Sequence, residues 1–239
     1  MLHVVAAAAV ASAPFWLGPS FAGHPLVAQT DGGVLVYGNC KIPEGQDEGG
    51  CSPPLQLQDR TTCERNVVAL DVVPRRIYRL RGSGIAADYG EASIDVGSGH
   101  TTTTVYANSD RFARRATKAM RRRGQTRAHR LAAPVYPAAV LKELKRVIVA
   151  SHTPRSAEEI GRALGLGPGV VRARVRLARL LPAGTLRDVP VPRRSWAQVQ
   201  HDRQIAFAAQ THQAQQRFGL TRAQVRRAVR RARGLTGSC

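Results

Sequence analysis

The apolar pattern of the chain changes its period midway, and this change constrains the fold more than any other feature. Residues 1–110 hold short alternating or β-rich runs broken by Gly, Pro, Asn and Asp, as strands and turns do. From Pro137 onward, apolar residues recur at helical spacing. The sequence therefore predicts an α+β fold: a small N-terminal domain with a mainly antiparallel sheet, then an all-α C-terminal domain. The expected strands are 34–37, 55–58, 76–81, 85–89, 92–96 and 101–107.

One helix is expected within the N-terminal domain, over residues 110–123. Ser109 is a suitable N-cap for it, because a serine hydroxyl can accept a hydrogen bond from the first turn. Phe112, Ala116 and Met120 are four residues apart, so they share one helix face. We expect that face to pack on the sheet.

The two halves also differ in charge. Residues 1–110 contain 7 Lys or Arg against 11 Asp or Glu, whereas residues 111–239 contain 29 against 5. So basic a half implies an anionic partner such as nucleic acid, an anionic membrane or an acidic polymer. Because the basic run that follows the predicted helix is broken by glycine and lacks apolar periodicity, we place a linker there. The predicted domains are 1–123 and 137–239, joined by a basic linker at 124–136.

Residues 157–181 predict two short helices joined by a tight turn. Ser156 and Glu159 have the spacing of a capping box, which marks the start of the first helix. Gly165 can adopt the positive φ that ends a helix, and Pro168 suits the first position of the next one. The second helix carries valines on one side and arginines on the other. Together with the helix that the apolar spacing predicts from Pro137 onward, this arrangement predicts a helix-turn-helix.

The segment 156–181 resembles the DNA-binding helix-turn-helix of bacterial sigma factors. The resemblance implies that the second helix of the pair enters the major groove of duplex DNA. The start of that helix, GPGV at 167–170, departs from the family because it offers base edges no side-chain donor or acceptor. We therefore expect binding through phosphates, with weak sequence preference. The residues that carry the resemblance are Ile160, Gly161, Leu164, Gly165, Leu166, Val171, Val175 and Ala178.

A degenerate second copy is predicted at 211–235. Segments 164–179 and 218–233 are identical at 8 of 16 positions, including a Gly-Leu pair and the valine spacing. The stretch before it, 196–217, is a polar, Gln-rich helical run without a clear turn. The start of the last helix has more polar side chains here, so base contacts are expected in this copy. The candidate nucleic-acid-binding residues are Arg172, Arg174, Arg176, Arg179, Arg222, Gln224, Arg226, Arg227 and Arg230.

The N-terminal half gives indications of a compartment. Cys40, Cys51 and Cys63 are close enough for one disulfide, Cys40–Cys51 or Cys51–Cys63, which would indicate an oxidising compartment; reduced thiols are the alternative. The N-terminus has an apolar run and an Ala-Ser-Ala triplet, as signal peptides have, but no basic start. Residues 15–107 resemble uncharacterised extracytoplasmic or lipoprotein-type proteins of GC-rich bacteria. That resemblance rests on FWLGPSFAG, VYGNC, GCSPPLQLQ and TTVYA and implies no chemistry.

No pattern in the sequence points to catalysis, a metal or a cofactor. The seven histidines form no HxxxH pair, the cysteines form no CxxC pair, and no phosphate-binding glycine loop occurs. No apolar run reaches the roughly 18 residues needed to cross a bilayer. We predict a non-enzymatic protein that binds duplex DNA in the cytoplasm, at the nucleoid. The alternative is an extracytoplasmic envelope protein whose basic helical tail binds an anionic polymer or a protein partner.

Overall fold

The computed structural model describes residues 15–30, 33–39, 52–62, 72–122, 130–192, 195–210 and 213–236. Its contacts divide the chain into two units, one formed by residues 1–61 and 78–134 and the other by 62–77 and 135–239. The first unit holds the sheet except for the first two residues of its edge strand at 76–79, and the second holds all described helices but one, which confirms the mixed α+β fold expected from the sequence. Cys40, Cys51 and Cys63, and with them the predicted disulfide, lie outside the described residues.

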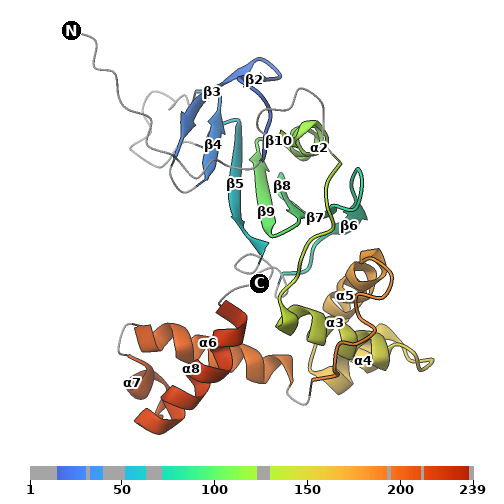
Figure 1. The fold of residues 1–239 in the computed structure, drawn as a ribbon, viewed down its shortest axis with the longest axis vertical. Helices are drawn as coiled ribbons and strands as arrows, with labels where there is room; N and C mark the ends of the chain where they lie inside the picture. The colour runs from blue at the N-terminus through green and yellow to red at the C-terminus, as the bar shows by residue number, and fades with distance from the viewer. Residues whose placement is uncertain are drawn as a thin grey trace. The chain divides into compact units, whose positions relative to one another are not determined.

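The first unit is built on an eight-stranded sheet in the order β2-β3-β4-β5-β9-β8-β7-β6 (Figure 1). Every strand pair whose register is defined runs antiparallel. All six strands expected from the sequence are present, and β2 and β3 extend the sheet beyond them at one edge. The strands are β2 Ser20–Phe21, β3 His24–Gln29, β4 Val34–Tyr37, β5 Leu55–Thr61, β6 Arg76–Arg79, β7 Ile85–Gly90, β8 Ser93–Ser98 and β9 Thr101–Ala107.

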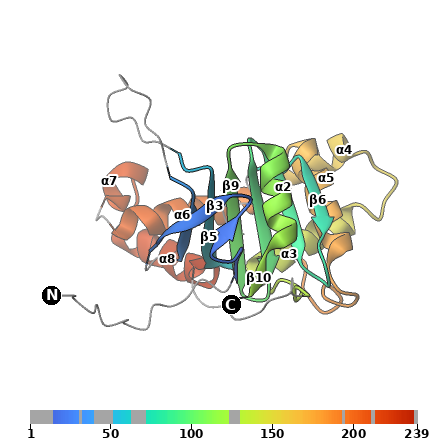
Figure 2. The same cartoon turned by 90° about the horizontal axis from the view of Figure 1, so that it is seen from above.

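Helix α2, Asp110–Ala119, covers one face of this sheet (Figure 2). Its Ser109 cap is confirmed, because the hydroxyl accepts a hydrogen bond from the Phe112 N–H at 3.3 Å. The predicted extension of the helix to residue 123 is wrong. The helix ends before Met120, and β10, Arg121–Arg122, pairs antiparallel with β1, Phe15–Trp16. Residues 121–122 therefore pair with a strand distant in the sequence instead of continuing the helix.

The end of the predicted linker belongs to the first unit. Residues 123–129 lie outside the described residues, but residues 130–134 group with the sheet. Leu131 forms a β-bridge with Gly82, and Pro134 forms one with Gly99. The division between the units therefore lies between residues 134 and 135.

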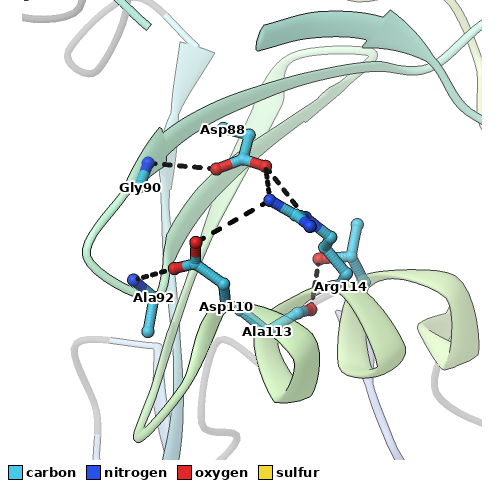
Figure 3. Close-up of polar contacts among 7 residues, drawn as sticks. Asp88, Gly90, Ala92, Asp110, Ala113 and Arg114 are labelled. Atoms are coloured by element: carbon cyan, nitrogen blue, oxygen red, sulfur yellow. Dashed lines mark hydrogen bonds and ion pairs between the residues drawn. The ribbon is translucent and has the colours of Figure 1, made fainter. Parts of the chain in front are cut away.

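A buried carboxylate joins α2 to the β7–β8 turn (Figure 3). Asp88 accepts one hydrogen bond from the Gly90 N–H at 3.0 Å and one from the Arg114 Nε at 3.1 Å. Asp110, the first residue of α2, accepts from the Ala92 N–H at 2.8 Å. Figure 3 shows Arg114 lying between the two carboxylates. This cluster holds a turn whose non-glycine residues have positive φ, 56° at Ala92, a conformation that most side chains avoid.

We predict that Asp88→Ala lowers the free energy of unfolding by about 2–3 kcal/mol, because it removes the buried acceptor of two hydrogen bonds. The matched control is Arg111→Ala on the exposed side of the same helix, which should change stability by less than about 0.5 kcal/mol. Urea unfolding measures both. Equal midpoints for Asp88→Ala and wild type would contradict this role for the cluster.

The helices of the second unit form two three-helix groups with separate apolar cores. The first core gathers Val147, Ile160 and Val171, and the second gathers Ile205, Ala208, Ala214 and Ala228. Within the described residues, no helix combines the length and the apolar character needed to span a bilayer. The first group consists of α3 Ala138–Ala150, α4 Ala157–Leu164 and α5 Pro168–Leu180; the second consists of α6 Trp196–Gln210, α7 Ala214–Phe218 and α8 Arg222–Thr236.

Candidate nucleic-acid interface

Helix α4 begins at the capping box predicted from the sequence. The Ser156 hydroxyl accepts a hydrogen bond from the Glu159 N–H at 3.2 Å, and the Glu159 carboxylate accepts one from the Ser156 N–H at 2.8 Å. Each side chain satisfies an N–H that the first helical turn leaves without a partner. The start of α4 is therefore fixed by two residues three positions apart, and its place in the chain agrees with the prediction.

A glycine turn sets the angle between α4 and α5. Gly165 ends α4 in the left-handed conformation, with φ 68° and ψ 38°. The Leu166 N–H then donates to the Gly161 carbonyl oxygen at 2.8 Å. A Cβ atom at Gly161 would lie 2.5 Å from the Leu166 carbonyl oxygen, so the close approach of turn and helix requires glycine there.

We predict that Gly161→Ala lowers the free energy of unfolding by about 1–2 kcal/mol, because the turn must move away from the added methyl group. Gly169→Ala is the matched control. Its Cβ would make only ordinary contacts, the nearest at 3.5 Å, and alanine favours the helix by up to about 1 kcal/mol. Thermal unfolding should therefore shift in opposite directions for the two variants. A Gly161→Ala protein as stable as wild type would show that the turn is not tightly packed.

Helix α5 presents a stripe of three exposed arginines. Arg172, Arg176 and Arg179 follow one another at intervals of four and three residues, so their side chains project from the same side of the helix. Val171 lies on the neighbouring, buried face, in the apolar core. The arginine stripe thus faces solvent beside the surface by which α5 is held, and it would be accessible to a DNA groove.

The structure removes Arg174 from this surface and corrects its assignment as a DNA contact. Its side chain is 3% exposed and forms an ion pair with Glu143 of α3, which is equally buried. Arg146 donates to the same carboxylate oxygen at 2.7 Å. Arg174 therefore connects α5 to α3 within the protein. A guanidinium so deeply buried is not available to phosphates.

An open groove of about 520 Å³ runs beside the arginine stripe. Apolar and basic side chains line it together, and they include a fourth arginine, Arg155, which is not among the candidate residues predicted from the sequence. In the sequence, only its position directly before the capping serine could have indicated that Arg155 belongs to this surface. The lining residues are Ser151, Arg155, Ala157, Ile160, Val171, Arg172, Val175, Arg176 and Arg179.

The charge of the groove is only partly compensated. Arg172 donates to Glu158 at 3.0 Å, and both side chains are more than half exposed. A hydrogen bond from its own backbone, together with Arg172, holds the pKa of the Glu158 carboxyl below its usual range. Arg155, Arg176 and Arg179 have no side-chain ion pair or hydrogen bond with any other described residue. Three guanidinium groups are therefore available to an anion.

The second three-helix group repeats the turn of the first. The predicted single helical run over 196–217 is wrong, because α6 ends at Gln210 and α7 begins at Ala214. Gly219 ends α7 with φ 63°, and the Leu220 N–H donates to the Gln215 carbonyl oxygen at 3.2 Å. Thr221 and Gln224 then form a capping box at the start of α8, with hydrogen bonds of 2.7 and 3.3 Å. This copy therefore has the same short helix, glycine turn and capped last helix as the first group.

The candidate residues of α8 are all exposed. Arg226 and Arg230 are four residues apart on one side of the helix, and Arg222 and Arg227 lie beside them. Gln224 is exposed too, but its side-chain oxygen already accepts the Thr221 N–H, so only its amide NH₂ is available to a base. The first turn of α8 thus has the polar side chains that the first turn of α5 lacks.

The second group also has its own ion pair between helices. Arg231 of α8 donates through Nε and Nη2 to the two oxygens of Asp202 on α6, each at 2.8 Å. Asp202 is buried, and this fork fixes α8 against α6. Arg231 therefore has the same task in this group as Arg174 has in the first.

The sequence-predicted residues form two surfaces, one on each group, apart from the buried Arg174. Across the part of the chain that the structure describes, no three His, Cys, Asp or Glu side chains gather where they could hold a metal ion. Comparison of the chain with protein-family models, with curated proteins and with solved structures found no match.

Proposed function

We propose that the second unit binds duplex DNA through the exposed arginines of α5 and α8, with weak sequence preference. The observation that carries this proposal is the pair of arginine stripes, each exposed on the last helix of a three-helix group whose neighbouring face packs into the core. Arg172, Arg176 and Arg179 would contact phosphates, and so would Arg226 and Arg230. A cytoplasmic location at the nucleoid belongs to the same proposal.

Base contacts are assigned to the first turn of α8. Arg222 and the amide of Gln224 carry donors that can reach base edges, whereas residues 167–170 of the first group carry none. We expect Arg222→Ala/Gln224→Ala to reduce discrimination between duplex sequences while leaving binding to mixed-sequence DNA within a few-fold of wild type. Competition between duplexes of different sequence measures this.

The salt dependence of binding tests the proposal. The five arginines assigned to phosphates predict a slope of log K against log salt of about −4.5 for B-DNA. Arg172→Ala/Arg176→Ala and Arg226→Ala/Arg230→Ala should each make the slope shallower by about 2. Anisotropy titrations of the full chain on a mixed-sequence duplex, from 50 to about 300 mM salt, give these values.

The control for these variants removes two positive charges elsewhere. Arg60 and Arg111 are exposed residues of the first unit, and Arg60→Ala/Arg111→Ala changes the net charge by the same amount. It should leave the slope within about 0.5 of wild type, since neither residue is assigned to phosphates. A wild-type affinity that does not change with salt concentration, or equal slopes for all variants, would contradict the DNA-binding proposal.

The apolar residues of the groove beside α5 favour a second candidate, an acidic protein partner. Ile160, Val171 and Val175 line the groove together with its arginines, and DNA phosphates make no use of apolar side chains. At about 0.3 M salt, where charge is screened but apolar contacts persist, an acidic peptide with leucines at helical spacing should compete for the groove at a lower concentration than polyglutamate does. Equal competition by the two peptides would argue against a protein partner. A protein partner is compatible with an extracytoplasmic envelope location as well as with a cytoplasmic one.

A further inference from the structure

The two three-helix groups have the same construction. In each, a short second helix ends at a left-handed glycine, Gly165 or Gly219. In each, the following leucine donates its N–H to the carbonyl five residues earlier, and the last helix begins two residues later. The core positions also correspond, at an offset of 54 residues: Val171 with Val225, Val175 with Val229, and Ala178 with Ala232.

The ion pairs that fix the last helix correspond as well. Glu143 of α3 holds Arg174 of α5, and Asp202 of α6 holds Arg231 of α8. The second arginine lies about one helical turn further along its helix than the 54-residue offset would place it. Both groups therefore fix their last helix to their first by an acid–arginine pair.

The same arginines face solvent in both groups. Arg172 corresponds to Arg226 and Arg176 to Arg230, and all four are exposed. A sequence that repeats only for packing would keep the valines and the glycine turn, but it would have no need to keep arginines at equivalent exposed positions. The repetition thus extends to the surface proposed for DNA.

The connection between the groups is short. The Lys145 ammonium donates to the carbonyl oxygens of Leu186 and Arg187 at 2.8 and 3.2 Å, which holds this segment on α3. Only residues 188–195 then separate the first group from α6. Eight residues reach at most about 26–29 Å. Because this connection is shorter than the roughly 34 Å pitch of B-DNA, it keeps the two groups close together, and two groups joined this way cannot occupy distant sites on one duplex.

From these observations we infer that the two groups bind one duplex at the same time, each placing its last helix in the major groove of successive turns. This inference rests on the proposed DNA binding and adds its arrangement, a continuous site of about two turns. Once one group is bound, the short connection holds the other at a millimolar effective concentration, so joint binding exceeds that of either group by roughly 10²–10⁴-fold.

Duplex length tests the inference. The full chain is titrated against a 12-bp duplex, which offers about one turn, and a 36-bp duplex of the same composition, with each Kd corrected for the number of overlapping registers. The ratio of the corrected short-duplex Kd to the corrected long-duplex Kd should be at least tenfold larger for wild type than for Arg172→Ala/Arg176→Ala or Arg226→Ala/Arg230→Ala. Inserting 20 Gly and Ser residues after Asp188 should weaken binding to the long duplex about sixfold and leave the short one unchanged.

Each outcome has a distinct meaning. The same length preference in wild type and in both double variants would overturn joint binding, and so would a long-duplex affinity that the insertion leaves unchanged. If the variant lacking all four arginines binds as tightly as wild type, the proposed DNA binding itself fails. Arg60→Ala/Arg111→Ala is the charge-matched control, and it should show the length preference of wild type.

Discussion

Arg174→Ala is expected to destabilise the helical unit by about 3–5 kcal/mol, the largest effect of any substitution proposed for this protein. Arg174 and Glu143 are each 3% exposed in their side chains, and they pair within the core between α3 and α5. Removing the arginine leaves a buried carboxylate with only Arg146 as its charged partner among the described residues. The cost of that uncompensated charge exceeds what the pair itself contributes to stability.

A double-mutant cycle separates the cost of the unpaired buried charge from the contribution of the ion pair itself. Arg174→Met with Glu143→Met removes both charges and keeps apolar volume, so the double variant should be more stable than either single variant. Chemical unfolding followed by circular dichroism measures all three. Arg176→Ala is the exposed control two residues away, and it should change stability by less than about 0.5 kcal/mol. A single Arg174→Ala variant with the stability of this control would contradict the buried pair.

Stability of the first unit is expected to fall as the pH rises from about 4 to about 7, because of Asp59. Burial raises the pKa of Asp59 from 3.8 to about 6, against hydrogen bonds from the Thr103 hydroxyl and the Phe15 backbone that lower it. Between these pH values the folded protein binds a proton that the unfolded chain has released. The unfolding free energy therefore decreases with rising pH, by up to about 3 kcal/mol in total.

Asp59→Asn should remove this dependence. The amide has nearly the same shape and no charge to bury, so the variant should exceed wild type by up to about 3 kcal/mol at pH 8 and match it at pH 4. Urea unfolding at pH 4, 6 and 8 gives the difference curve, in which the titration of other groups cancels. Asp188→Asn, an exposed change of the same charge, should leave the curve of wild type unaltered. A constant difference between Asp59→Asn and wild type at all three pH values would exclude the effect.

Local patterns in the sequence were enough to place the helix-turn-helix of the first group. A capping box needs residues three positions apart, and a left-handed glycine ends a helix within one turn, so Ser156, Glu159 and Gly165 could be read directly. The repeat was also visible, because Gly219 and the valines recur at a fixed offset. The polar run before it concealed the break between α6 and α7, since no glycine or proline marks that break.

By itself, the sequence determined the fold class, most of the strands and the exposed arginine stripes, all of which follow from the spacing of neighbouring residues. Only the tertiary structure decided that Arg174 is a core residue, because its partner Glu143 lies 31 positions away. It likewise decided that Arg121–Arg122 leave α2 to pair with Phe15–Trp16, and that Arg155 joins the groove beside α5. Helix periodicity records which side a residue faces, but whether a charge on that side meets solvent or an opposite charge depends on elements distant in the chain.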